Sequence, residues 1–264
     1  MAIAVATIVL VLLLLLPLVG ILLRVDPAQV FQRLGEKPVL DALWLSVKTS
    51  TIVTVVVVCL GLPAAYLLAT REFAGKRCLE TLVDLPMILP PTVSGFALLM
   101  AFGRAGIAGK TLSLFGLSLP FTTLGVVVAQ VFMAVPFFIG PARAGFASVE
   151  QRYLDAAATL RASPSHIFWR VMIPLSRGSL LAGAAMAWAR ALGEFGATIT
   201  FAGNLPGRTQ TMPLAVYLAM QDDLDRAATL SILLVTMAVI LLLGLRRTGL
   251  GLFAPRRDAT RQPA

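Results

Sequence analysis

Few residues of this chain have the types and spacing that enzymatic chemistry requires. The segment 103–111, "GRAGIAGKT", ends like a phosphate-binding loop, whose backbone amides and lysine hold nucleotide phosphates. Such a loop needs a glycine five positions before Gly109, but Arg104 stands there and Gly103 lies one residue too far. No strand pattern precedes the segment, so we interpret it as a polar loop and not as an ATP site.

Other catalytic patterns are also missing from the sequence. There is no HExxH, CxxC or GxSxG motif, and His166 is the only histidine. A zinc site or a serine triad needs more ligands or partners than one histidine supplies. Cys59 lies in an apolar run and Cys78 in a basic loop, so we interpret both as free thiols. We therefore expect no catalytic residue, no metal, no cofactor and no enzymatic activity in this chain.

One charged pair lies inside an apolar stretch. Arg190 and Glu194 are four residues apart, a spacing that places both side chains on one face of a helix, where they can pair. Charges inside a membrane are costly and normally face a bundle interior or a water-filled cavity. Two interpretations stay open: the pair fixes helix packing, or it takes part in a translocation pathway.

The residues around this pair are small or carry hydroxyls. Gly193 and Gly196 have a spacing that allows close contact between helices. Thr198 and Thr200 would offer hydroxyl donors on a shared face, suitable for a passing oxyanion. Together with Arg190 and Glu194, they are our candidate translocation pathway or gate.

Composition indicates what kind of element positions these residues. Of the 264 residues, 58% are hydrophobic and 13% are charged, and the mean hydropathy is +0.88. Soluble domains carry about 25% charged residues. The net charge of +9 does not indicate nucleic acid, because the basic residues gather at the ends of apolar runs. The predicted fold class is an all-α integral membrane protein.

Six apolar runs are long enough to cross a bilayer, which takes about 20 residues. The first run has no basic residue before it and no cleavage site after it, so we expect an uncleaved anchor and not a signal peptide. The segments between the runs are expected to be short loops, and the C-terminal tail is expected to be disordered. The predicted spans cover residues 3–23, 41–70, 81–103, 122–146, 178–200 and 225–245.

The distribution of Lys and Arg predicts the orientation. The loops 71–80 and 147–177 and the C-terminal tail together hold 12 of these residues, against six in the loops on the opposite side. Cytoplasmic loops carry the excess of Lys and Arg in membrane proteins. We therefore expect both termini and the segment 147–177 on the cytoplasmic side.

Prolines interrupt the third run, in "DLPMILPPTVSGF" (84–96). Pro86, Pro90 and Pro91 each lack a backbone N–H and disturb a regular helix. Two interpretations stay open here. The helix is broken at membrane depth, against protein or a water-lined cavity, or the prolines mark an ordinary helix entry at the interface.

The basic segment between the fourth and fifth runs is predicted to form two short helices with a sharp joint. Ser163 and Pro164 suit the N-cap and first position of the second helix, which we expect Pro174 to end. The first helix carries an apolar row from Tyr153 to Leu160. This row exceeds what a loop can bury, which indicates a partner protein. A helix lying on lipid headgroups is the alternative.

This segment resembles a known family signature. "DAAATLRASPSHIFWRVMIP" (155–174) resembles the motif of the permease subunits of bacterial ABC importers: an acidic residue, two alanines, a glycine, nine residues and Ile-x-Leu-Pro. In that family the loop is a coupling helix that fits a groove on the cytoplasmic ATPase subunit. The resemblance implies this coupling role for Asp155, Ala156, Ala157, Leu160, Arg161, Ser163, Pro164, Val171, Ile173 and Pro174.

Two positions depart from the motif. Asp155 replaces the usual Glu and is one methylene shorter. Arg161 stands where the motif has Gly, which takes a positive φ at a helix end without strain. Arg161 either adopts that conformation, at a cost of about 1 kcal/mol, or changes the shape of the joint.

A narrower resemblance concerns "LGEFGATITFAGNLPGRTQTMPLAVY" and "LPMILPPTVSG", which resemble the molybdate branch of these permeases. It implies the architecture of a type I ABC importer permease. The chain would then comprise an anchor and external loop in 1–38, the permease core in 39–246 with its coupling loop in 147–177, and a cytoplasmic tail in 247–264. It also implies a second copy of the chain, a cytoplasmic ATPase dimer, an extracytoplasmic molybdate-binding protein and membrane lipid as partners.

The expected function is that of a permease subunit that translocates molybdate across the plasma membrane, driven by a separate ATPase. Tungstate, sulfate or another oxyanion is an alternative cargo, because tungstate is nearly isosteric with molybdate and the sulfate branch shares the Gly-Glu-Phe-Gly core. A channel or carrier independent of an ATPase is the alternative of a different class.

Overall fold

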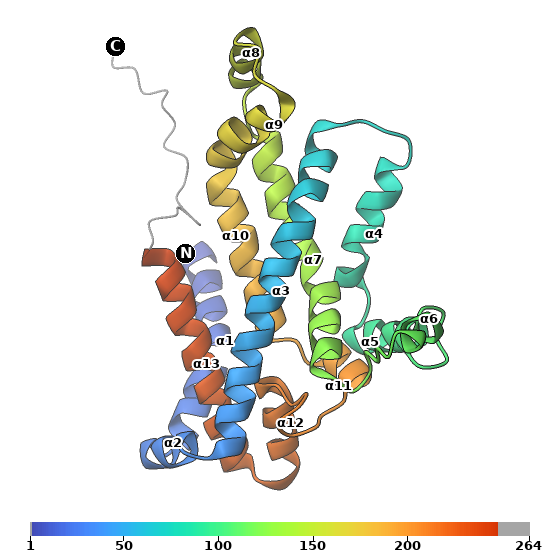
Figure 1. Cartoon of the computed structure of the whole chain (residues 1–264). Helices are drawn as coiled ribbons and strands as arrows, with labels where there is room; N and C mark the ends of the chain where they lie inside the picture. The colour runs from blue at the N-terminus through green and yellow to red at the C-terminus, as the bar shows by residue number, and fades with distance from the viewer. Residues whose placement is uncertain (1, 248–264) are drawn as a thin grey trace.

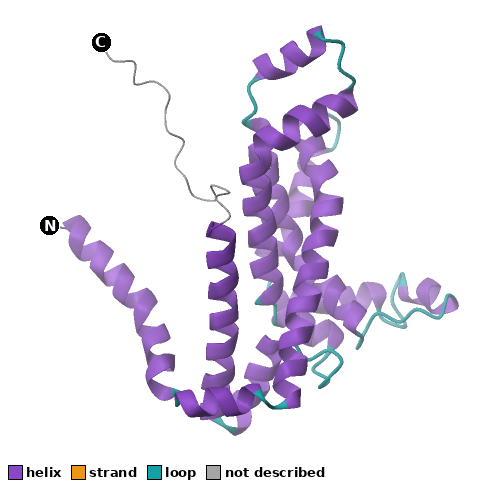
Figure 2. Cartoon of the chain, turned by 60° about the vertical axis from the view of Figure 1, so that its left-hand side comes forward, coloured by secondary structure: helices purple, strands orange, loops and turns teal. Residues whose placement is uncertain are grey.

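Long apolar runs become long helices in the computed structural model, which describes residues 2–247 (Figure 1). Every regular element in that range is helical, and no strand occurs there (Figure 2). The helices are α1 (Ala2–Arg24), α2 (Pro27–Leu34), α3 (Lys37–Thr70), α4 (Lys76–Ile88), α5 (Pro91–Phe102), α6 (Gly109–Leu114), α7 (Thr123–Ala147), α8 (Gln151–Thr159), α9 (Pro164–Ile167), a π-helical turn (Phe168–Met172), α10 (Ile173–Leu192), α11 (Gly196–Ala202), α12 (Met212–Asp222) and α13 (Leu224–Arg247). The tail predicted to be disordered, residues 254–264, lies outside the described residues.

The central core is the contact of α7 with α3 and α10. Phe138 of α7 lies between two glycines, and its side chain is almost fully buried. A Cβ atom on Gly61 of α3 would lie 2.7 Å from the Phe138 ring, and one on Gly183 of α10 would lie 3.0 Å from the Phe138 carbonyl oxygen. Small residues therefore let these three helices approach closely, as they do in membrane bundles.

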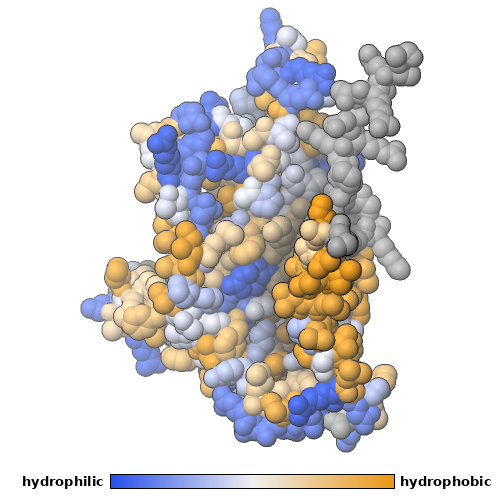
Figure 3. Space-filling model, turned by 180° about the vertical axis from the view of Figure 1, so that it is seen from behind, coloured by the Kyte–Doolittle hydropathy of each residue, from blue (hydrophilic) through white to orange (hydrophobic). Residues whose placement is uncertain are grey.

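The surface suits a membrane. Helix α1 has no buried residue, and most leucines along it are more than half exposed, Leu13 at 67% for example. Figure 3 shows apolar side chains along the sides of the molecule and hydrophilic ones gathered mainly at its two ends. In water such a surface would be unfavourable, whereas hydrocarbon accepts it.

Four helical stretches in the described range are long and apolar enough to cross a bilayer: α1, α3, α7 and Pro164–Leu192. The pair α4 and α5 would add a fifth. Each of the six predicted runs falls on helix, with α13 covering the last. The third and fifth runs, however, are not single helices: each is divided into two helices.

The third run is broken where its prolines stand. Helix α4 ends at Ile88, α5 begins at Pro91, and the two axes are bent by 119°. Leu89 and Pro90 between them have extended backbone conformations. Since neither Pro90 nor Pro91 can donate a hydrogen bond to the preceding turn, the helix cannot continue through them. Of the two interpretations, a broken helix and an ordinary helix entry, the structure has the broken helix.

The fifth run, predicted as one span over 178–200, is broken as well. Helix α10 ends at Leu192, and α11 begins at Gly196. Phe195 between them has φ −128° and ψ −58°, outside the helical region. The predicted single helix is therefore wrong from Gly193 onward.

The end of the molecule that holds α2 and α12 carries a cluster of ion pairs. Arg24 contacts Asp225 at 2.9 Å, and Arg33 contacts Asp223 at 3.5 Å. The backbone N–H of Arg226 donates to Asp223, which lowers the pKa of that carboxyl. Exposed ion pairs of this kind contribute about 0–1 kcal/mol each to the free energy of folding. Their main effect is to link α1 and α2 to the start of α13.

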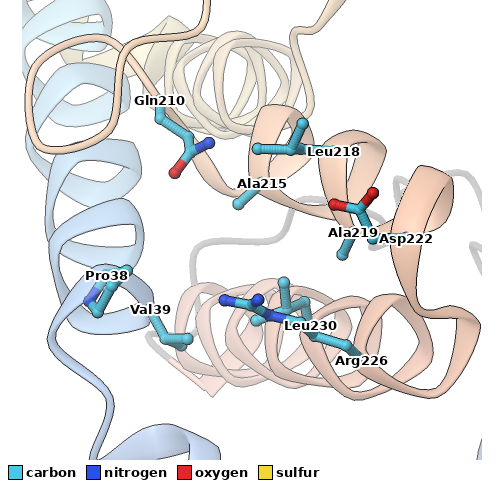
Figure 4. Close-up of a pocket in the computed structure, with 9 residues that line it drawn as sticks. All are labelled: Pro38, Val39, Gln210, Ala215, Leu218, Ala219, Asp222, Arg226 and Leu230. Carbon is cyan, nitrogen blue, oxygen red and sulfur yellow. The ribbon is translucent and has the colours of Figure 1, made fainter.

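Next to this cluster, the start of α3 and the helices α12 and α13 border an open pocket of about 80 Å³ (Figure 4). Arg226 projects into it from α13, and Asp222 lies on α12 (Figure 4). Nearby, the backbone N–H of Met212 donates to the buried Ser46 hydroxyl at 2.7 Å, which attaches α12 to α3. The segment after α11 is thus held against the N-terminal half of the bundle.

Candidate coupling segment and gate

The candidate coupling segment, residues 147–177, projects from the end of the bundle opposite α2 and α12 (Figure 1). Its first helix, α8, ends in a left-handed residue: Arg161 has φ +56°. The N–H of Arg161 donates to the carbonyl of Ala158 at 2.9 Å, and that of Ala162 donates to Ala157 at 3.1 Å. These two bonds are those of a Schellman motif, in which glycine is the usual left-handed residue. Arg161 therefore keeps the conformation that the family motif assigns to glycine.

The joint and the start of the second helix are as predicted. The Ser163 hydroxyl accepts the N–H of His166 at 3.3 Å, and Pro164 occupies the first turn of α9. The prediction that Pro174 ends this helix is wrong. A π-helical turn follows α9, in which the N–H of Ile173 donates to Phe168, and the helix continues through Pro174 into α10. The wider turn absorbs the proline, which has no N–H to donate.

The predicted apolar row is left uncovered in the described chain. Tyr153 is 42% exposed, and Leu160 is 83% exposed. Asp155 is also exposed, and its carboxylate accepts only the amide of Gln151, at 3.0 Å. Of the other predicted coupling residues, Ala156 is exposed and Ala157 is half-buried on α8, whereas Val171, Ile173 and Pro174 lie at the junction with α10.

An aromatic contact that was not predicted from the sequence anchors this segment. Phe168 lies with its ring centroid 4.8 Å from that of Tyr66 on α3 and 6.2 Å from that of Phe146 on α7. Tyr66 and Phe146 meet edge to face at 5.7 Å. Aromatic pairs in this distance range contribute about 0.5–1.5 kcal/mol beyond their buried area. The π-helical turn is therefore attached to both neighbouring helices.

At the far end of α10, Glu194 occupies the break before α11. Its side chain is fully buried and forms an ion pair with Arg190, as predicted. We expected Glu194 on the same helix as Arg190, but it lies beyond the end of that helix. Its other carboxylate oxygen accepts the N–H of Ala197 at 2.8 Å. One side chain thus neutralises the charge on α10 and caps the first turn of α11.

Arg190 is less enclosed than its partner. Its side chain is 22% exposed, and its guanidinium lies 5.9 Å from the ring centroid of Phe137 on α7. This geometry permits a cation–π contribution. The positive group therefore faces a partly open position while the carboxylate behind it is sealed in protein.

The two broken helices, α5 and α11, pack directly against each other. A Cβ atom on Gly95 would lie 2.7 Å from the carbonyl oxygen of Ala197, and one on Gly196 would lie 2.7 Å from Cβ of Pro91. Gly196 therefore makes the close contact predicted for it. Gly193 does not, because it is exposed and would meet only a carbonyl oxygen of its own helix, at 3.6 Å.

The two threonines do not share a face. On a helix, residues two apart point about 200° from each other, and both lie on α11. Thr198 is fully buried, whereas the Thr200 hydroxyl donates to the carbonyl of Gly196 at 2.9 Å. The predicted pair of free donors is therefore reduced to one.

One further ion pair in the structure was not predicted from the sequence. Arg143 of α7 contacts Glu80 of α4 at 3.0 Å and links these two packed helices. Arg143 stands inside the apolar run 122–146, so an intramembrane charge was visible in the sequence. Its partner was not, because Glu80 lies 63 positions earlier in the chain.

Comparison with known proteins identifies the family. Residues 58–251 match the model for the binding-protein-dependent transport system inner membrane component. The chain belongs to this family. It is a multi-pass membrane permease component of an ABC transport system, as the resemblance of the coupling motif predicted.

Curated relatives cover most of the chain. A Mycobacterium tuberculosis protein named molybdenum transport system permease protein ModB is 43% identical over 89% of this chain and 90% of its own length. The Escherichia coli K12 protein of the same name is 37% identical over 78% of this chain and 91% of its own length.

Solved structures agree in fold. A bacterial ABC transporter involved in the import of the acidic polysaccharide alginate is similar, with a TM-score of 0.77 at 14% identity over 94% of this chain and 93% of that one. The MetNI methionine ABC transporter has a TM-score of 0.65 at 16% identity over 81% of this chain and 97% of that one. These similarities confirm the predicted fold class.

The conformation of Arg161 generates a prediction. Arg161→Gly should stabilise the end of α8 by about 1 kcal/mol, since a left-handed conformation costs other residues about that much more than glycine. Hydrogen exchange of the amides at 160–162 should slow by about fivefold. The matched control is Arg152→Gly in the first turn of α8, where glycine should instead speed exchange. Faster exchange in Arg161→Gly would contradict the left-handed assignment.

Proposed function

We propose that this chain is the permease subunit of an ATP-driven importer of molybdate. The observation that carries the proposal is the 43% identity, over 89% of the chain, to proteins named as molybdenum transport permeases. The stretch "LGEFGATITFAG" contributes most of the candidate gate: Arg190 pairs with its Glu194, and its Gly196 packs against α5. Tungstate and sulfate are also tetrahedral dianions, so a competition assay must show which of the three anions the transporter prefers.

The partners follow from the same proposal. A separate ATPase would hydrolyse ATP and dock on the candidate coupling segment, whose exposed Tyr153 and Leu160 suit a protein groove better than water. An extracytoplasmic binding protein would deliver the anion to the opposite end. A second copy of the chain would complete the pathway. Attachment of Phe168 to α3 and α7 supports this role, because movement of the docked segment would reach the bundle through packed rings.

Reconstitution tests the proposed function and the docking together. Vesicles that contain the chain, its ATPase and its binding protein should take up molybdate when ATP is supplied, and excess sulfate should compete weakly. Asp155→Ala should weaken co-purification of the ATPase, and Ala157→Pro should abolish it, because proline disrupts the last turn of α8 at a cost of about 3 kcal/mol. Both variants should still insert into the membrane.

The control for this experiment is Glu72→Ala. It removes an exposed carboxylate from the same end of the molecule, outside the candidate coupling segment. Its ATPase binding and uptake should match the unaltered chain. Full binding and uptake in both Asp155→Ala and Ala157→Pro would refute docking through α8.

We also propose that both termini and the candidate coupling segment face the cytoplasm, as the excess of Lys and Arg on that side indicates. Cys59 and Cys78 are exposed and must first be replaced by serine. In sealed cells, a cysteine at the exposed Lys110 should react with an impermeant maleimide, and one at the exposed Ser165 should react only after lysis. The opposite labelling pattern would invert the topology.

The pathway role of Arg190 and Glu194 is likewise our proposal. Glu194→Gln keeps an oxygen for the Ala197 N–H but removes the negative charge beside Arg190. It should destabilise the protein by less than the about 3–5 kcal/mol lost when a fully buried pair is broken, since Arg190 is partly exposed. The double variant Arg190→Gln/Glu194→Gln should recover stability but transport at least about tenfold more slowly, because a neutral side chain does not attract a dianion.

Thermal unfolding and anion uptake, measured on the single and double variants, separate the two interpretations. The matched control is Glu80→Gln/Arg143→Gln, which removes an ion pair of the same charge between α4 and α7. Uptake at the unaltered rate in the Arg190/Glu194 double variant would leave that pair a packing role alone.

A further inference from the structure

The half of the molecule away from the candidate coupling segment has an open pocket outside the candidate gate. It has a volume of about 600 Å³ and lies between the end of α5, the start of α7 and the connection from α11 to α12. Figure 1 shows these elements in the half of the chain opposite α8 and α9. The polar side chains that line the pocket are Arg104, Ser118, Thr122 and Arg208, and none of its lining residues is acidic.

The two arginines of this pocket carry charges that the described chain does not neutralise. Both are exposed, and within residues 2–247 neither forms an ion pair. At the α2 end, by contrast, Arg24 is paired with Asp225 at 2.9 Å. Two positive charges in one concave site raise the local concentration of anions. The pocket therefore favours an anionic ligand.

Hydrogen bonds hold the backbone of Arg208 in place. The Thr123 hydroxyl at the start of α7 donates to the Arg208 carbonyl at 2.8 Å. The N–H of Arg208 donates to the carbonyl of Leu205 at 3.1 Å, and the N–H of Leu205 donates to the buried Thr209 hydroxyl at 2.9 Å. The connection from α11 to α12 is thus a closed turn attached to α7.

Arg104 follows an equally constrained turn. The N–H of Gly103 donates to the carbonyl of Leu99 at 2.7 Å, and the N–H of Gly106 donates to the carbonyl of Gly103 at 2.8 Å. A Cβ atom on Gly103 would lie 2.3 Å from the Leu99 carbonyl oxygen, so only glycine fits there. Both arginines therefore extend from fixed backbone, and a ligand that binds them does not have to order a loop.

A strained residue forms part of the pocket wall. Phe121 has φ +59°, in the left-handed region that residues other than glycine rarely adopt. Its N–H donates to the carbonyl of Phe201 on α11 at 3.4 Å. Phe121 is 52% exposed, so burial in the core does not explain the strain. Strained backbone is concentrated at sites that hold ligands, which agrees with a functional pocket.

We propose that this pocket is a receiving site for the tetrahedral oxyanion, in which Arg104 and Arg208 bind the anion after it leaves the binding protein. This inference rests on the proposed function and adds a site outside the candidate gate. Guanidinium groups donate paired hydrogen bonds to anion oxygens, and two of them match the charge of a dianion. The exposed Ser118 hydroxyl can add a donor, whereas that of Thr122 already donates to Leu119 at 2.7 Å.

The size and place of the pocket suit transient binding. A volume of about 600 Å³ holds an anion together with several waters, each of which occupies about 30 Å³ in the liquid. An anion that keeps part of its hydration is released more readily than one that is fully enclosed. The pocket opens at the surface of one chain and requires no route through the packed helices. Passage across the membrane would still need the second copy.

The test measures binding of radioactive molybdate to the purified full chain by equilibrium dialysis, without ATPase or binding protein. Arg104→Gln and Arg208→Gln should each weaken binding by about tenfold, because each removes charge-assisted hydrogen bonds. Arg208→Lys should weaken binding less, since it keeps the charge and loses only the planar fork. The unfolding temperatures should not change, because both side chains are exposed.

Lys110→Gln is the matched control. Lys110 is exposed on α6, in the same segment between α5 and α7, but it does not line the pocket. The variant loses the same charge as Arg104→Gln and should bind molybdate within about twofold of the unaltered chain. An equal loss in Lys110→Gln and Arg104→Gln would show that overall charge attracts the anion, and would overturn the inference.

A second measurement separates the oxyanion from another anionic ligand, an acidic side chain of the binding protein. Docking of the loaded binding protein on the reconstituted transporter should be unchanged in Arg104→Gln and Arg208→Gln, while the rate of molybdate uptake falls. Weaker docking with unchanged molybdate binding would assign the arginines to the binding protein and refute the receiving site.

The failures of the two proposals are distinguishable. An unaltered chain that binds no molybdate in dialysis, or arginine variants that bind it equally well, would overturn this inference while uptake by the reconstituted transporter still supports the proposed function. A reconstituted unaltered transporter that imports no molybdate would overturn the proposed function, and the role of the pocket with it.

Discussion

The arrangement of the broken helices depends on the carboxylate of Glu194. One of its oxygens neutralises Arg190 at the end of α10, and the other caps α11 through the N–H of Ala197. An uncompensated charge or an uncapped helix start at this depth would be costly, because the site is sealed from water. Because Glu194 both pairs with Arg190 and caps α11, the backbone can leave α10, turn at Phe195 and begin α11. The close packing of α11 on α5 follows from that turn.

A continuous helical path connects this break to the candidate coupling segment. From Pro164 to Leu192 the backbone stays helical, because the π-helical turn lets it pass Pro174 without interruption. Phe168 attaches the start of this path to α3 and α7, and Glu194 attaches its end to α11. A displacement of the docked segment would therefore act on the proposed gate through one rigid element. The exposed side chains of α8 lie just before the start of this path, and the Arg190–Glu194 pair lies at its end.

The local signals in the sequence were reliable where the physics is local. The Ser163 cap was predicted correctly, because it depends on backbone donors within a few residues. At Arg161 and at Pro90 and Pro91 the sequence located the irregular backbone but left two conformations open, and the structure decided between them. The Arg190–Glu194 pair was predicted correctly because its two residues are only four positions apart in the chain. The errors came where neighbours decide. Pro174 did not end its helix, and the fifth run did not stay one helix, since hydrogen bonds of a π-helical turn and a buried cap outweighed simple propensity.

The sequence by itself determined the class of protein, its apolar helices and the coupling motif, because hydropathy, charge and short motifs are properties of the chain alone. Only the tertiary structure decided that Phe168 meets Tyr66 and Phe146, that Gly95 meets Ala197, and that Glu80 meets Arg143. It alone showed that Arg104 and Arg208 line one pocket. Such facts join residues far apart in the chain, and whether a charged group is paired depends on every neighbour that folding brings to it.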